Sequence, residues 1–228
     1  MGQQRLFEFQ MGERSPETHV VTAANRAAAE LLQGWRTWPG GAMALTGPAG
    51  SGKSHLANAW AADAGATPFD AREPPAAAAA AFEAAGGRLV LDDADQAADD
   101  LTLIRVLDLA RWQSGAVLLV GQEDPSRWPC ATPDLVSRLG ALPAARLLEP
   151  DEALLTLVLR RLCRERFIEL SDKAATYLAS RMQRTFAAAH ALADELDRSV
   201  VRAARPVALP QAREALSRVE ARLAGEAE

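Results

Sequence analysis

The sequence predicts an α/β fold in which a parallel five-stranded sheet is flanked by helices and followed by a small all-helical domain. Apolar runs typical of strands alternate with helical patterns over the first 149 residues, as in sheets whose parallel strands are joined by helices. The run 116–121 is apolar throughout, which is typical of a strand buried on both faces. Only helical patterns follow Glu149-Pro150. We therefore expect a tail over 1–18, an α/β domain over 19–149 and a helical lid over 150–228.

Local signals bound the elements expected in the α/β domain. The first helix places Ala28, Leu31, Leu32 and Trp35 at helical spacing. Prolines begin the alanine-rich third helix and glycines follow it, which is the usual punctuation of a helix. The helices are expected at about 26–35, 55–64, 74–85, 101–113 and 134–139, and the strands at 42–46, 67–70, 88–92, 116–121 and 145–148.

Four helices are expected in the lid. Asp151 and Ser171 are residue types that cap helices, and each precedes an amphipathic pattern. Pro206 and Pro210 separate the last helix from the one before it. The expected ranges are 151–166, 173–182, 186–203 and a final amphipathic piece that ends near residue 223.

Composition excludes several classes of function. The formal charge of −5 argues against a broad basic surface, so direct sequence-specific DNA binding is not expected. The two cysteines, Cys130 and Cys163, lie far apart without metal-ligand spacing, which favours packing roles in a reduced cytosolic protein. No apolar run approaches the roughly 18 residues of a membrane span, and the N-terminus lacks the apolar core of a secretory signal. A cytoplasmic location is expected.

A complete phosphate-binding motif follows the first strand. It consists of Gly47, Pro48, Ala49, Gly50, Ser51, Gly52, Lys53 and Ser54, which match G-x-x-x-x-G-K-[ST] between a strand and a helix. Glycines let the backbone direct several N–H groups at one anion, and the helix adds the positive end of its dipole. We expect Lys53 to bind the β- and γ-phosphates of ATP or ADP, and the Ser54 hydroxyl to bind Mg²⁺.

Acidic and polar residues follow two other strands. Asp92 and Asp93 end the strand 88–92, and we assign Asp92 to the metal and Asp93 to the attacking water. Gln122, Glu123 and Asp124 follow the strand 116–121, at the edge where ligands bind in open α/β sheets. One of these three could sense the γ-phosphate. The sequence leaves open which, and Glu123 is the candidate.

Two other residues have alternative interpretations. Arg138 could act as an arginine finger that neutralises charge on a phosphoryl group bound to a neighbouring subunit, or it could form an ordinary surface salt bridge. Asn25 could cap the first helix or face the base of a nucleotide, and its residue type favours capping.

The N-terminal tail carries the pattern Q-x-x-L-F, formed by Gln3, Leu6 and Phe7. An extended segment of this kind can place its two apolar anchors in a preformed pocket of a partner. The pattern looks like the short peptide by which many bacterial proteins dock on the replication sliding clamp. A tail that folds back on its own core is the alternative.

The order of these parts resembles the AAA+ ATPases, and among them the DnaA/Hda family, over about residues 19–203. The resemblance rests on Val20-Val21 to Asn25-Arg26, Gly52-Lys53-Ser54-His55-Leu56, Asp92-Asp93, and Leu135-Val136-Ser137-Arg138-Leu139. It implies that Val21, Asn25 and His55 contact the nucleotide together with the phosphate-binding loop. It also implies that Arg138 is the arginine finger.

The chain departs from the pattern of that family in two respects. There is no room for the C-terminal DNA-binding domain of DnaA, which points to the Hda branch, whose members bind the clamp and stimulate ATP hydrolysis by DnaA. The family's sensor arginine in the lid has only Arg184 as a candidate, because the aligned position is alanine. We therefore expect weak intrinsic hydrolysis, with ADP as a possible resident ligand and a homodimer as a possible assembly.

Two other classes of function remain as alternatives. A helicase loader or adaptor would use the same core with its own ATP cycle. A small-molecule phosphoryl-transfer enzyme would use the same loop, but the helical pattern after Pro150 offers no obvious acceptor pocket.

Overall fold

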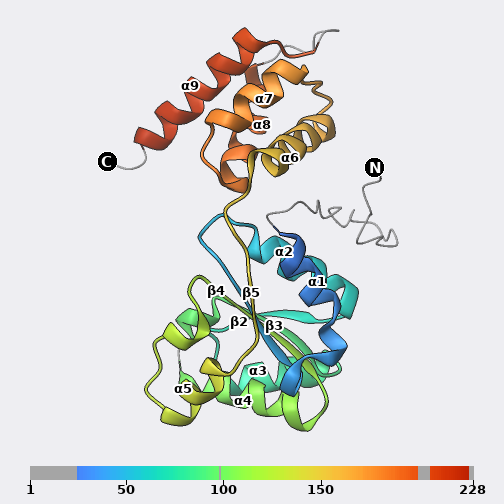
Figure 1. Cartoon of the computed structure of the whole chain (residues 1–228), viewed down its shortest axis with the longest axis vertical. Coiled ribbons are helices and arrows are strands. Elements are labelled where there is room, and N and C mark those ends of the chain that lie inside the picture. Colours follow the sequence, from blue (N-terminus) through green and yellow to red (C-terminus); the bar gives the residue numbers. More distant parts are fainter. Residues whose placement is uncertain (1–24, 98, 200–205, 226–228) are drawn as a thin grey trace. The chain divides into compact units, whose positions relative to one another are not determined.

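The computed structural model of the chain describes residues 25–97, 99–199 and 206–225 (Figure 1). Contacts divide the chain into two compact units, one up to Leu148 and one from Glu149.

The first unit is built on a five-stranded sheet. Its strands are β1 (Ala42–Thr46), β2 (Thr67–Asp70), β3 (Arg88–Asp92), β4 (Ala116–Gly121) and β5 (Ala144–Arg146). All pair in parallel in the order β2-β3-β4-β1-β5, and β1 runs beside β4 from Ala42 opposite Val117 to Thr46 opposite Gly121. The predicted fold class is confirmed. The last strand is shorter than the predicted range 145–148, because the backbone leaves the sheet after Leu147 donates to the carbonyl of Thr46.

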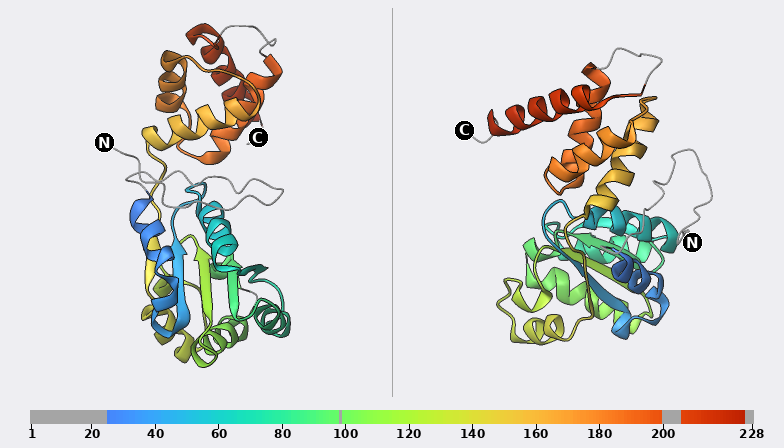
Figure 2. Two further views of the ribbon diagram at one scale, coloured as in Figure 1. Left: turned by 90° about the vertical axis from the view of Figure 1, so that its right-hand side faces the viewer. Right: turned by 45° about the horizontal axis from the view of Figure 1, so that its top comes forward.

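Helices cover both faces of this sheet (Figures 1 and 2). On one face, α1 (Arg26–Gln33) and α2 (Lys53–Ala64) pack on alternate side chains of β1 and β4. On the other, α3 (Pro75–Ala84), α4 (Asp100–Trp112) and α5 (Pro133–Gly140) pack on the remaining ones. Because each face has its own core, β4 is apolar at every position rather than at alternate ones.

Details of packing differ from the expectation in α1. Trp60 of α2 stacks on Trp38 with ring centroids 5.2 Å apart, and it meets Trp35 edge-on at 6.3 Å. Trp35 follows α1 in a short 3-10 turn. Leu31, expected on the inner face, is 46% exposed, while Leu32 is fully buried. The apolar face of α1 is therefore narrower than the helical spacing predicted.

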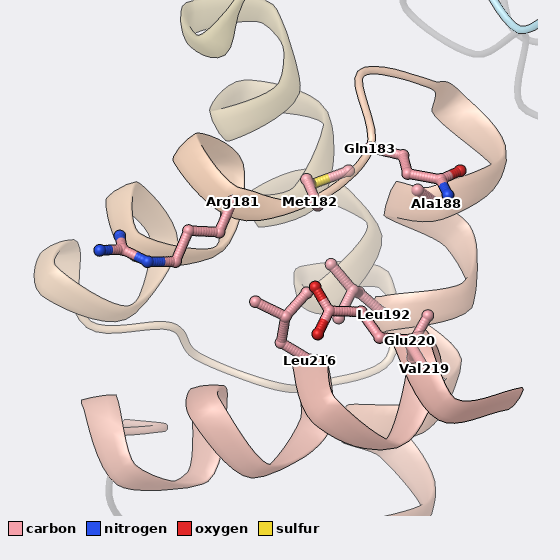
Figure 3. Close-up of a pocket in the computed structure, with 8 residues that line it drawn as sticks. All are labelled: Arg181, Met182, Gln183, Ala188, Leu192, Leu216, Val219 and Glu220. Atoms are coloured by element: carbon pink, nitrogen blue, oxygen red, sulfur yellow. The ribbon is translucent and has the colours of Figure 1, made fainter. Parts of the chain in front are cut away.

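The second unit consists of α6 (Glu152–Glu165), α7 (Asp172–Arg181), α8 (Phe186–Ser199) and α9 (Leu209–Gly225). The predicted caps are present, since Asp151 accepts from the amide of Leu154 and Ser171 from that of Ala174. Pro210 lies in the first turn of α9 rather than before it, where proline is tolerated. A cavity of about 270 Å³ opens between the α7–α8 turn and α9 (Figure 3). Leu192, Leu216 and Val219 line it.

A buried carboxylate joins α8 to α9. Glu195 is 5% exposed and accepts from Arg222 at 2.7 Å, from Arg198 at 3.3 Å and from Arg218 at 3.4 Å. The hydrogen bond from Arg222 is the main cause that holds the pKa of Glu195 below its usual value. Among the described residues of the helical unit, Glu195 is the one buried charged side chain.

Both cysteines pack against apolar side chains in their own units. Cys163 is buried, and burial raises its pKa to about 12, while Cys130 is half-buried beside the α3–α5 core. None of the described helices is long and apolar enough to span a bilayer.

Candidate functional site

The phosphate-binding motif forms the loop between β1 and α2. Gly47, Gly50 and Gly52 have φ angles of 152°, 73° and 91°, which glycine adopts easily and other residues rarely. At Gly47 a side chain is also excluded by space, because a Cβ would lie 2.6 Å from the carbonyl oxygen of Leu147. These glycines therefore set the curvature of the loop.

Lys53 lies within the curve of the loop. Its ammonium group donates to the carbonyl oxygens of Gly47 at 2.8 Å and Pro48 at 2.9 Å. Burial lowers the pKa of Lys53, and the charges of Asp95, Asp92 and Asp93 oppose that shift, in decreasing order. An ammonium has three N–H donors, so one remains for an anion without displacing either carbonyl.

Other groups of the loop fit a polyphosphate. The hydroxyl of Ser51 is buried and has no hydrogen-bond partner among the described residues, which is a costly state that a ligand would relieve. The first N–H groups of α2 have no acceptor within the helix, and they point where an anion is favoured. Ser54 is exposed at the second position of α2, and the half-buried His55 follows it.

Ser54 and Asp92 are the residues that would hold Mg²⁺. A Mg²⁺ ion beside phosphates takes most of its ligands from phosphate oxygens and water, so one hydroxyl and one carboxylate suffice from the protein. Asp92 ends β3, and its Oδ1 accepts from the amide of Asp93 at 3.1 Å.

Asp93 is turned toward a different partner. Its backbone is in the left-handed region with φ 50°, and its carboxylate lies 3.7 Å from the guanidinium of Arg72. Arg72 also binds Asp70 at 2.6 Å, and this contact holds the pKa of Asp70 at about 2. The water-positioning role predicted for Asp93 would thus compete with Arg72.

The ends of β1, β3 and β4 are connected by a short chain of hydrogen bonds. Asp95 Oδ2 accepts from the amide of Gln122 at 2.7 Å, and the carbonyl of Gln122 accepts from the amide of Gly47 at 3.2 Å. Asp95 was not among the predicted site residues. Its only signal in the sequence is that it is the third acid of Asp92-Asp93-Ala94-Asp95, and a 3-10 turn over 94–96 brings it back to the sheet.

Glu123 does not reach the loop. Its side chain is exposed and lies 3.8 Å from Arg127, while its carbonyl accepts from the indole of Trp128. The carboxylate of Asp124 accepts from Ser126 and stabilises the following turn. Of the three polar residues after β4, Gln122 is therefore the one that contacts the phosphate-binding loop.

Arg138 is held by two carboxylates of its own unit. Its Nη1 donates to Asp108 of α4 at 2.5 Å, and its Nε lies 2.8 Å from Asp134, one turn earlier on α5. These hydrogen bonds, that of Asp108 first, raise the pKa of Arg138. The salt-bridge interpretation therefore describes the isolated chain, with about a third of the side chain still exposed.

Asn25 and Arg184, both predicted to contact the nucleotide, belong to different units of the chain. Asn25 is buried at the start of α1, but its side chain makes no capping hydrogen bond, so the capping interpretation is wrong. Arg184 belongs to the helical unit, where it is exposed in the turn between α7 and α8, just before Thr185. Val21, Gln3, Leu6 and Phe7 lie outside the described residues.

No protein-family model and no curated protein matches the chain. Among solved structures, domain III of the Thermotoga maritima replication initiation protein DnaA aligns with 90% of this chain and 95% of its own, at 16% identity and a TM-score of 0.70. The replication initiator DnaA bound to AMPPCP and single-stranded DNA aligns with 94% of this chain at 17% identity and a TM-score of 0.65. The Thermotoga maritima RuvB Holliday junction branch migration motor aligns with 85% at 21% identity and a TM-score of 0.62.

These likenesses describe the fold. The chain spans 70% of the length of that DnaA chain and 65% of that RuvB chain. At such identities similar backbones host different activities. The chain has the fold found in domain III of DnaA.

Proposed function

We propose that this protein is an adenine-nucleotide-binding AAA+ regulator that docks on the replication sliding clamp and stimulates ATP hydrolysis by DnaA, so limiting initiation of chromosome replication. The observation that carries the proposal is the assembled phosphate-binding loop, which holds Lys53 and an unpaired Ser51 hydroxyl and lies near enough to Asp92 for its charge to act on Lys53. Its support from relatives is that a DnaA of the same fold was solved with AMPPCP.

In this proposal the nucleotide orders the chain rather than fuelling it. Bound Mg²⁺ supplies charge neutralisation to the phosphates. The loop amides and Lys53 bind and orient the phosphates, while Ser54 and Asp92 hold the metal. The proposal includes weak intrinsic hydrolysis, because Asp93 would have to leave Arg72 to position the attacking water and Glu123 faces Arg127.

Arg138 is proposed to act on the partner's nucleotide. An arginine supplied across a subunit boundary stabilises charge on the transferring phosphoryl group and raises rates by about 10³–10⁵. Its present partners Asp108 and Asp134 are 39% and 58% exposed, so exchanging them for a phosphate costs about 1 kcal/mol or less per pair. The two ion pairs would thus hold the guanidinium ready without preventing its transfer.

The decisive experiment measures ATP hydrolysis by DnaA with clamp and DNA present. Arg138→Ala and Arg138→Lys should both fail to stimulate hydrolysis, since a lysine cannot reproduce the planar fork of the guanidinium. Arg111→Ala is the control, because Arg111 lies on α4 and stacks on Trp112. Stimulation by Arg138→Ala equal to that of the unmutated chain refutes the finger.

Nucleotide binding is tested separately. Lys53→Ala should lower the affinity for a fluorescent ADP analogue by at least a hundredfold. The variant loses the ammonium group that donates to the two loop carbonyls and would bind the phosphate. Lys173→Ala, on the exposed side of α7, should leave the affinity unchanged. If the unmutated chain takes up neither ADP nor ATP in calorimetry, the nucleotide part of the proposal fails.

Clamp docking is assigned to the tail. Changing Gln3, Leu6 and Phe7 together to alanine should abolish clamp binding while nucleotide affinity is retained. Clamp binding by that triple variant would reject the assignment.

A helicase loader or adaptor is the second candidate, because the same fold also serves the RuvB branch migration motor. It predicts robust intrinsic ATP turnover and co-purification with a helicase in place of the clamp. Turnover that is absent without DnaA excludes it.

A further inference from the structure

Gln122 follows β4 at a position where the neighbouring strand β3 no longer runs beside the chain. β3 ends at Asp92, and the left-handed turn at Asp93 takes the backbone out of the sheet. By the register of the pair, Leu91 lies opposite Leu119, so no β3 residue lies beside Gln122. The carboxylate of Asp95 supplies the missing acceptor at 2.7 Å. A side chain therefore replaces a strand at the edge that carries the loop.

The position of Asp95 is tightly fixed. A Cβ built on Gly121 would lie 3.2 Å from the Cβ of Asp95 and 2.6 Å from the ring of Trp128, so both residues pack directly against the backbone of β4. The indole of Trp128 in turn donates to the carbonyl of Glu123 at 2.7 Å. The Asp95 carboxylate is thus locked beside the end of β4 on one side and bonded to Gln122 on the other.

From Gln122 the contacts lead directly into the loop. The carbonyl of Gln122 accepts from the amide of Gly47, one residue past the last paired position of β1, Thr46 opposite Gly121. The carbonyl of Gly47 accepts from Lys53. Gln122 and Gly47 are therefore each held at both the N–H and the C=O, and Asp95 is the outermost support of the series.

The second carboxylate oxygen of Asp95 indicates that this residue is not there for fold stability alone. Asp95 Oδ1 is buried and has no hydrogen-bond donor among the described residues. A buried acceptor without a donor destabilises the folded state. An apolar residue at position 95 would avoid that cost, but it would leave the amide of Gln122 without its acceptor.

We propose that Asp95 is a positioning residue of the phosphate-binding loop: it fixes Gln122, which fixes Gly47 and hence the loop carbonyls and amides around Lys53. The consequence for nucleotide affinity rests on the proposed function. The consequence for the backbone does not. Asp95 acts through Gln122 and Gly47 and need not touch the ligand.

The test compares Asp95→Ala with Asp95→Asn. Alanine removes the acceptor, whereas asparagine keeps an oxygen for the amide of Gln122 and removes only the charge. Asp99→Ala is the matched control, because Asp99 lies in the same segment but accepts from Leu101 at the start of α4. The readouts are amide hydrogen exchange at Gln122 and Gly47 without nucleotide, and affinity for a fluorescent ADP analogue.

Asp95→Ala should speed exchange at Gln122 and Gly47 and lower the affinity for the ADP analogue by tenfold or more. Asp95→Asn should keep the protection of both amides and an affinity within about threefold, since it preserves the hydrogen bond. Unchanged exchange in Asp95→Ala, or exchange in Asp95→Asn as fast as in Asp95→Ala, overturns the positioning role. If the unmutated chain binds no nucleotide, the proposed function fails, and the exchange data still decide the role of Asp95.

Discussion

Removal of the Glu195 carboxylate tests how the helical unit is held together. In Glu195→Ala the three arginines that surround the carboxylate lose their shared partner, and the ion pairs that join α8 to α9 through Glu195 are lost. Breaking a buried ion pair by removing one partner costs about 3–5 kcal/mol. The arginine side chains are 43–59% exposed and can return to water, so the loss should be smaller, about 2 kcal/mol.

Thermal and urea unfolding followed by circular dichroism measure this loss. For a chain of this length, 2 kcal/mol corresponds to a fall in Tm of about 4–8 °C. Glu214→Ala is the matched control, because Glu214 binds the same Arg218 at 2.6 Å from a carboxylate that is 65% exposed. It should cost about 0.5 kcal/mol or less.

The dependence on pH gives a second check. The folded-state pKa of Glu195 lies below its unfolded value of about 4.5, so its stabilisation is fully present above that value and is lost as the pH falls through the folded pKa. The stability difference between the unmutated chain and Glu195→Ala should therefore be constant from pH 6 to 8 and shrink below pH 4.5. A fall in Tm of less than 1 °C would refute the reasoning. So would a stability difference between the two chains that is the same at pH 3 as at pH 7.

Three further outcomes follow from individual side chains. Gly121→Ala should lower the free energy of unfolding by about 1–3 kcal/mol in urea titrations, since the added Cβ would lie 2.6 Å from the ring of Trp128; full stability would contradict the packing described. Phe167→Gly should raise it by about 0.5–1 kcal/mol, because Phe167 is 91% exposed and has φ 59°, and a loss of stability would show that the ring is in contact. Cys163, with a pKa of about 12, should resist iodoacetamide at pH 8 in the folded chain while the half-buried Cys130 reacts first; equal rates would contradict the burial of Cys163.

The fold was predictable because its signals are local. The continuous apolar run of β4 requires helices on both faces, and the glycines around Lys53 permit only a tight loop between strand and helix. The caps Asp151 and Ser171 lie beside the helices they begin, so residue type and position alone identified them.

The parts of the site that were missed depend on contacts between distant segments. Asp95 meets Gln122 across 27 residues, and Arg138 meets Asp108 across 30, so neither pairing has a sequence signal. The contact between Gln122 and the loop has no sequence signal either, because the backbone of Gln122, rather than its side chain, makes it. Tertiary geometry decides such cases, and charge type alone does not.

The strand order also bears on when the binding loop can exist during synthesis. β1 is the first strand to be synthesised, yet its neighbours β4 and β5 are the last two strands of the sheet. The carbonyl of Leu147, which follows β5, packs closely against Gly47 of the loop. A nascent chain whose first 147 residues or so have not all left the ribosome therefore lacks the strands that support its phosphate-binding loop. Shortened translation products that end before that point would contain every residue of the motif and still be unable to form the binding site.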